Sequence, residues 1–294
     1  MNTLFMKNYQ NFMLFFTFFL FWFSIQFGQF VEDSVAFVLI ISLGILHGAN
    51  DLLILSKGKN ERKLFLKNLC IYLAIILACI LIYLLSSFVA IILFILLSSY
   101  HFGEEHLGEK IKGHKLFNAI YYLAYGVFLF SMLFYVSISD VDEIMRELTQ
   151  ATFTKLQIEI SFLISSSILL VASGYLVFKE KALLSMLLKE VFYLCLLFVV
   201  FKTSSLILGF AIYFILWHSI PSLLNQVAFI YGNLKKESVW SYVKKALIYW
   251  VISVFGMFIL YQIIPQINLF STIIFVVLFA VTAPHTWVMY RMKS

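Results

Sequence analysis

Charged residues are scarce in this sequence. Asp, Glu, Lys and Arg make up 12% of its 294 residues, whereas a soluble domain carries about 25%. Hydrophobic residues make up 63%, and the mean hydropathy is +0.98. A soluble protein of this length needs polar residues to cover its outside, and this chain has too few. Most of its surface is therefore expected to face lipid.

The sequence also lacks the alternating pattern of a membrane β-barrel, whose strands show apolar and polar residues in turn over about ten residues. Its apolar runs are near the roughly 20 residues that a transmembrane helix needs. We therefore predict an all-α, polytopic helix bundle that forms a single transmembrane domain over residues 1–294. Ten spans are predicted: 11–30, 34–56, 64–86, 87–106, 116–138, 158–178, 182–201, 204–225, 241–264 and 268–290.

Cysteine is almost absent as well. Cys70, Cys79 and Cys195 are scattered through apolar runs and form no CxxC pair. Such a set predicts neither a disulfide framework nor a thiolate metal site. The three are interpreted as small packing residues.

The net charge of +6 would suggest a nucleic-acid partner in a soluble chain, but the distribution of the charge indicates membrane topology. With a cytoplasmic N-terminus, only three of the 21 basic residues fall on outside connections: Arg146, Lys155 and Lys202. The positive-inside rule then predicts a multi-pass protein of the cell (inner) membrane, with both termini inside and no nucleic-acid partner. The longest outside stretch, about 139–157, is acidic and is predicted to form one amphipathic surface helix.

Four of the six histidines lie within predicted spans, where polar residues are costly and mark function by default. They are His47, His101, His218 and His285. Their spans all run from outside to inside, and each histidine lies in the cytoplasmic half. At about 1.5 Å per residue, the four can lie at one depth and converge. His106 and His114 are interpreted as solvated loop residues.

Converging imidazoles predict a metal site. Neutral imidazole binds Fe, Zn, Cu or Ni, and a structural zinc would usually recruit cysteine. Oxygen chemistry at Fe(II) fits the set better, although spacing alone leaves the metal open. Asp51 follows His47 by four residues, and Glu104 and Glu105 follow His101 by three and four. These carboxylates are candidates to accept the free imidazole N–H and orient the ring.

The sequence around each histidine is specific: GILHGAND at His47, SYHFGE at His101, YFILWHS at His218 and APHTWV at His285. Together and in this order, the four motifs resemble the Brp/Blh family of β-carotene 15,15′-dioxygenases, and the resemblance covers nearly the whole chain. It implies a membrane iron enzyme that cleaves the central double bond of β-carotene with O2 into two all-trans-retinals, often for a retinal-binding rhodopsin.

The resemblance also implies roles for individual residues. His47, His101, His218 and His285 match the family's histidine positions and would be the catalytic Fe(2+) ligands. Many members carry a further histidine one turn after the third motif, where this chain has Ile220, Pro221 and Ser222. If that residue is the family's fourth ligand, either His285 completes the site in this chain or the iron has three histidines and an open position. Tyr100, Phe102 and Trp217 flank the proposed ligands and are candidates for the wall of a polyene tunnel. Pro221 and Pro284 are expected to kink their helices beside the ligands.

Other functions are also compatible with intramembrane histidines. A metal-ion or proton transporter would use the same intramembrane histidines, although no internal repeat is evident and the four share one depth. A haem protein with axial histidine pairs is a second alternative. A diiron membrane desaturase is disfavoured because its HxxxH and HxxHH clusters do not occur.

Overall fold

The computed structural model describes residues 3–57, 62–111, 113–263 and 269–293, and no β-strand occurs within these ranges. The helices are α1 (Thr3–Gln26), α2 (Gln29–Leu39), η1 (Ile40–Gly44), α3 (Ile45–Gly48), α4 (Asp51–Leu55), α5 (Arg62–Leu85), α6 (Ser87–Leu107), α7 (Lys115–Val136), α8 (Ile138–Thr149), α9 (Lys155–Lys179), α10 (Leu183–Thr203), α11 (Leu206–Ile212), η2 (Tyr213–Ser219), α12 (Ile220–Tyr231), α13 (Lys236–Ile263) and α14 (Leu269–Lys293). The prediction of an all-α bundle is confirmed.

Nine helical segments in the described part of the chain are long and apolar enough to cross a membrane, and they coincide with the second to tenth predicted spans. The first predicted span, 11–30, lies mostly on α1, a 24-residue helix that is not one of the nine, and its last two residues begin α2. The boundaries predicted at 264 and 268 lie outside the described residues. The orientation across the membrane stays a prediction.

Two of the nine spans are broken by π-helical turns. In Gln29–Leu55, η1 separates α2 from α3, and in Leu206–Tyr231, η2 separates α11 from α12. Such turns often occur at functional sites. Pro221 lies in the first turn of α12, directly after η2. Proline is tolerated in the first turn of an α-helix, where its missing N–H is not needed.

The helices α6 and α7 pack against each other more closely than side chains would allow. Gly103 on α6 lies against the backbone of Tyr122, where an added Cβ would be 2.0 Å from the carbonyl oxygen. Gly126 on α7 lies against Ser99, where a Cβ would be 2.1 Å from the carbonyl oxygen. Small residues at helix contacts let backbones approach in this way. This contact fixes the position of His101 on α6.

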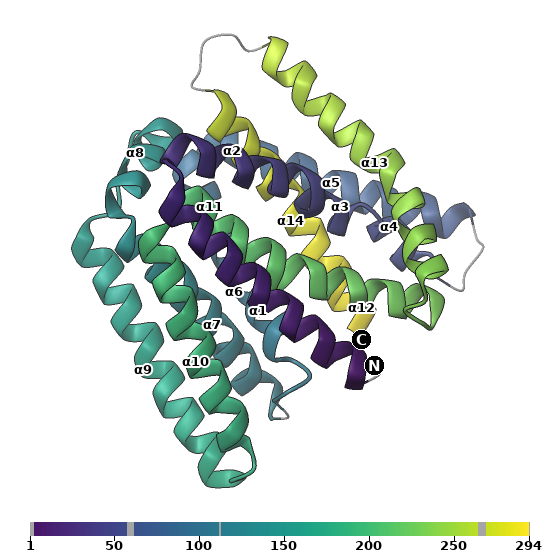
Figure 1. The fold of residues 1–294 in the computed structure, drawn as a ribbon. Helices are drawn as coiled ribbons and strands as arrows, with labels where there is room; N and C mark the ends of the chain where they lie inside the picture. The colour runs from purple at the N-terminus through teal and green to yellow at the C-terminus, as the bar shows by residue number, and fades with distance from the viewer. Residues whose placement is uncertain (1–2, 58–61, 112, 264–268, 294) are drawn as a thin grey trace.

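The short connections and the surface helix also follow the sequence. The helices α5 and α6 are separated by Ser86 alone, which caps α6 by accepting a hydrogen bond from the amide of Val89 at 3.4 Å. The acidic stretch forms α8, whose apolar face is buried through Val141, Met145 and Leu148. In Figure 1, α8 covers one end of the bundle, next to the start of α2 and α11.

Candidate metal and substrate site

Four elements bring the intramembrane histidines together. His47 lies on α3, His101 on α6, His218 in η2 and His285 on α14, and each side chain is between 1% and 6% exposed. Neighbouring ring centres are 4.7 Å apart for His47 and His285, and also for His101 and His218. The other two neighbouring pairs are separated by 5.2 Å (His101–His285) and 5.5 Å (His47–His218). Each of the four imidazole rings thus has two of the others as neighbours.

This spacing suits imidazoles that share one metal ion. Imidazole nitrogen binds a metal at about 2.1 Å, which places neighbouring ring centres roughly 4.5–5.5 Å apart. Among the described residues, however, no group of three or more His, Cys, Asp or Glu side chains is arranged to hold a metal ion as it stands. The two observations differ because ring centres record where side chains lie, whereas ligation also depends on where the ring nitrogens point.

The nitrogens themselves are chemically suited to ligation. Both ring nitrogens of His101, both of His218 and Nε2 of His285 are buried and have no hydrogen-bond partner in the described part of the chain. Buried polar atoms are normally paired, and each exception calls for an explanation. Each of these three rings therefore has a buried nitrogen whose lone pair is free to bind a metal.

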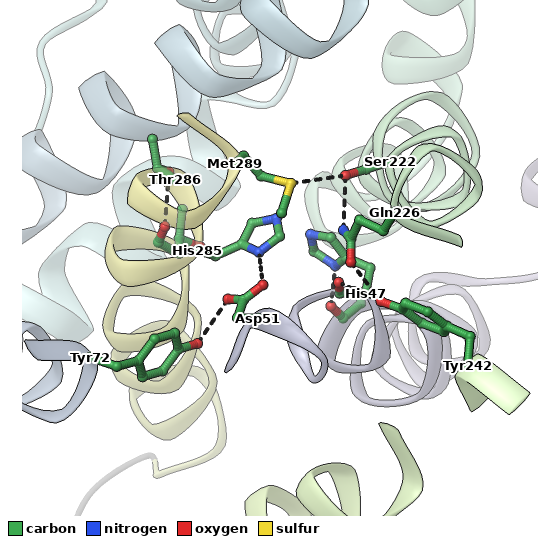
Figure 2. Close-up of polar contacts among 11 residues, drawn as sticks. His47, Asp51, Tyr72, Ser222, Gln226, Tyr242, His285, Thr286 and Met289 are labelled. Atoms are coloured by element: carbon green, nitrogen blue, oxygen red, sulfur yellow. Dashed lines mark hydrogen bonds and ion pairs between the residues drawn. The ribbon is translucent and has the colours of Figure 1, made fainter. Parts of the chain in front are cut away.

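Two of the other nitrogens, Nδ1 of His285 and Nδ1 of His47, have partners that fix their rings. Nδ1 of His285 lies 2.8 Å from Oδ1 of Asp51, and Tyr72 donates its hydroxyl to Oδ2 of the same carboxylate at 3.0 Å. Nδ1 of His47 lies 2.5 Å from the carbonyl oxygen of Gly44. Figure 2 shows Asp51 between Tyr72 and His285. A ring that donates from Nδ1 keeps Nε2 as its basic nitrogen.

Asp51 has a different histidine partner from the one that was expected. Its spacing from His47 suggested that it would orient that ring, but it contacts His285 instead. The chain turns at Ala49 and Asn50 between α3 and α4, so the four-residue helical spacing does not hold across this break. Asn50 anchors the turn by donating its side-chain amide to the carbonyl of Tyr242 at 3.0 Å.

Glu104 was expected to orient His101, and this expectation is wrong. Its carboxylate accepts hydrogen bonds from Tyr100 at 3.2 Å and from Lys293 at 3.4 Å. Glu105 accepts from Asn225 at 2.8 Å and forms an ion pair with Lys293 at 3.1 Å. Because Lys293 ends α14 and Asn225 lies on α12, these contacts join three of the histidine-bearing segments at one end. Glu104 thus helps to set the register of the helices.

The aromatic candidates for a tunnel wall separate into two groups. Phe102 is buried against His218, with ring centres 4.5 Å apart. Trp217 instead donates its indole N–H to Thr17 at 3.1 Å and packs on Tyr193, and Tyr100 bonds to Glu104. The contacts of Trp217 and Tyr100 therefore lead away from the four histidines, because neighbours on a helix point to different sides.

A stacked row of rings leads from His218 to an apolar pocket that the sequence did not reveal. Phe214 stacks on His218 with ring planes 15° apart, and Phe210 stacks on Phe214 with planes 12° apart. Phe210 lines a pocket between α2, α6, α7, α8, α11 and α14 whose walls are entirely apolar. The sequence does contain a signal for this row, because Phe210 and Phe214 are four residues apart and so lie on one helix face. This spacing does not stand out in a chain with 33 phenylalanines.

A second hydrogen-bonded network supports His47 from the other side. Tyr242 donates to Gln226 at 2.6 Å and also lies 3.3 Å from the carbonyl oxygen of His47. Gln226 donates to Ser222 at 3.2 Å, and Ser222 reaches the sulfur of Met289. Figure 2 shows this network beside the imidazoles. Ser222, one turn after His218, is therefore engaged in the network that supports the site.

The expectation that His106 is a solvated loop residue is wrong. It lies on α6 as part of the bundle, and its Nε2 is 2.6 Å from Oε2 of Glu190 on α10. Only 11% of its side chain is exposed, so it is not a solvated loop residue. His114 does lie at an exposed position, where it caps the start of α7.

The Asp51–His285 contact carries a testable prediction. We expect the substitution Asp51→Asn to lower metal affinity and activity by about 10- to 100-fold, as loss of a carboxylate behind a ligating histidine typically does. Iron content of the purified chain and product formation would measure both effects. Tyr72→Phe, which removes only the outer contact, should have a smaller effect in the same direction. Full iron loading in Asp51→Asn would contradict the assignment.

Comparison with known proteins agrees with the motifs. A search of curated proteins and a search of solved structures returned no match. A family model described as beta-carotene 15,15′-dioxygenase matches residues 38–293. This range includes all four histidines, Asp51 and the aromatic row from Phe210 to His218. The chain belongs to the β-carotene 15,15′-dioxygenase family.

Proposed function

We propose that this protein cleaves the central 15,15′ double bond of β-carotene with O2 into two molecules of retinal, at a non-haem Fe(II) held by His47, His101, His218 and His285. The observation that carries the proposal is the convergence of four buried imidazoles with five unpaired nitrogens in a chain of this family. The cell membrane is the proposed location, since the substrate is dissolved in lipid.

The chemistry that Fe(II) supplies when bound is the activation of O2 for addition across the central double bond. The atoms of one carotene and one O2 are those of two retinals, so no further reductant is needed. The nitrogen donors suit this metal because imidazole binds Fe(II), while carboxylate remains outside the ligand set and acts through His285.

The contribution of the chain is to position the polyene and exclude water. Phe102, Phe214 and Phe210 present ring faces and edges between the histidines and the apolar pocket. The proposal places one end ring of the long hydrocarbon in this pocket and its centre beside the imidazoles. Correct placement of the reacting bond and exclusion of water are the effects by which such a site accelerates the reaction.

The direct experiment is expression in bacteria engineered to accumulate β-carotene, beside a His47→Ala variant produced at the same level. We expect the parent to remove the orange colour and yield retinal on chromatography, and the variant to leave the carotene intact. Retinal from both chains would reject the proposed ligand set.

The same experiment distinguishes carotene cleavage from the transporter alternative. A parent chain that is loaded with iron but leaves carotenes intact would overturn the cleavage proposal. Uptake of iron or protons into vesicles that contain the purified chain would then be the next measurement.

A further inference from the structure

The apolar pocket at the end of the row from His218 to Phe210 lies inside the bundle. Every side chain that lines it is buried or half-buried. Its volume is about 170 Å³, and an apolar cavity of about 150 Å³ in another protein holds the six-membered ring of benzene. The pocket therefore has the size and the apolar walls that suit the six-membered ring at one end of a carotene.

Four helical segments fix the distance between this pocket and the histidines, because each segment that carries a histidine also lines the pocket. The lining residue nearest to each histidine along its segment is Ile40 for His47, Ile95 for His101, Phe210 for His218 and Leu278 for His285. These intervals of six to eight residues correspond to roughly 9–12 Å along a helix. The far edge of the pocket, at Ile91 and Leu206, is roughly 15–18 Å from the histidines.

This interval matches half the length of β-carotene. An extended chain advances about 1.2 Å per bond, and about nine bonds separate the central double bond from the end ring, so the ring begins roughly 11 Å from the centre of the molecule. The rings of Phe214 and Phe210 stack along the same interval. An end ring in the pocket therefore corresponds to a central double bond at the level of the histidines.

The helix α8 closes the far end of the pocket. At the far edge, the amide of Leu206 donates a hydrogen bond to Asp140 on α8 at 3.5 Å, and Figure 1 shows α8 across this end of the bundle. Met145 lines the pocket from α8 and is 4% exposed, whereas the next residue, Arg146, is exposed. The buried side chain of Met145 therefore limits how deeply a ring can enter.

We propose that Met145 is a specificity-determining residue, which stops the end ring of the carotene at the depth where the central double bond lies beside the imidazoles. The inference rests on the proposed function, because it concerns which bond of the carotene is cleaved. Without this stop the ring can enter about two bonds deeper, or roughly 2.4 Å, and the neighbouring double bond reaches the histidines. Cleavage there gives a longer aldehyde and a shorter ketone, whose atoms are again those of one carotene and one O2.

The first test is the ratio of products in bacteria that accumulate β-carotene, measured by chromatography for the parent, Met145→Ala and Met132→Ala. Met132 is a matched control, because it is 3% exposed and faces α9 and α10 from α7. One methylene in an apolar pocket changes discrimination by about 10- to 200-fold, so we expect the ratio of retinal to off-centre products to fall about tenfold in Met145→Ala and to change less than about twofold in Met132→Ala. An unchanged ratio in Met145→Ala, or an equal fall in both variants, would overturn the proposal.

The second test does not depend on cleavage. The full chain is purified without iron, placed in lipid nanodiscs and given β-carotene in the absence of oxygen, and circular dichroism is recorded at visible wavelengths. Because β-carotene is achiral, a signal reports carotene held in an asymmetric site rather than dissolved in lipid. We expect a saturable signal from the parent and from Met132→Ala, and loss of most of it in Val141→Phe, whose larger side chain enters the space of the pocket.

No signal from the parent, or an equal signal from Val141→Phe, would overturn the assignment of the pocket to the carotene ring. The unfolding temperature of Val141→Phe in detergent should match that of the parent, because the new ring fills existing space. A signal that depends on the pocket, in a chain that forms neither retinal nor off-centre products, would reject the cleavage proposal and the role of Met145 in bond selection, while the pocket would stand as a carotene site.

Discussion

Replacing His101 with alanine is expected to reduce bound iron from about one ion per chain to background and to reduce retinal formation to below about 1% of the parent. His101 lies between His218 and His285, and both of its nitrogens lack other partners. Its removal therefore takes one of the four neighbouring imidazoles out of the cluster. Metal analysis of the purified chain and retinal chromatography would measure the two effects.

The matched control is His114→Ala. His114 is exposed at the start of α7, where its ring accepts a hydrogen bond from the amide of Leu116 at 3.4 Å. Loss of such a cap costs about 1 kcal/mol of stability and leaves the histidine cluster intact. We expect iron content and activity near those of the parent. Iron retained at one ion per chain in His101→Ala would show that the metal is held elsewhere.

The substitution Gly126→Ala is expected to separate α6 from α7 and to lower thermal stability sharply. The added Cβ would lie 2.1 Å from the carbonyl oxygen of Ser99 and 2.3 Å from its Cα, and backbone atoms cannot rotate away. Overpacking costs about 1–3 kcal/mol and occasionally more, and a contact between two backbones belongs at the upper end. Because Ser99 lies two residues before His101, metal binding should weaken as well.

Gly174→Ala provides the matched control for this prediction. Gly174 is exposed on α9, and a Cβ there would meet no atom within 4 Å. Alanine favours a helix over glycine by up to about 1 kcal/mol, so this variant should be as stable as the parent or slightly more stable. The unfolding temperature in detergent would measure both. Equal unfolding temperatures for the two variants would contradict the packing described for α6 and α7.

The span pattern and the histidine set were accessible from sequence because each depends on local chemistry. A run of about 20 apolar residues can only be helical in lipid, and a histidine in such a run is costly wherever its helix lies. The motifs at His47, His101, His218 and His285 could therefore be recognised without any knowledge of how the helices pack.

Contacts between helices could not be predicted in the same way. Spacing suggested that Asp51 serves His47 and Glu104 serves His101, but the turn at Asn50 directs Asp51 to His285, and Lys293 from the distant C-terminus engages Glu104. His106 looked like a loop residue until α10 placed Glu190 beside it. In each case the partner is more than 80 residues away in the chain.

The sequence by itself determined a lipid-embedded helical protein with four intramembrane histidines and the motifs of a carotenoid-cleaving family, because hydropathy and residue type are properties of single segments. The tertiary structure alone decided which carboxylate supports which imidazole, that π-helical turns precede His47 and contain His218, and that an apolar pocket lies at the end of the row from His218 to Phe210. The physical reason is that side-chain direction and register depend on how helices break and cross, and no single segment contains that information.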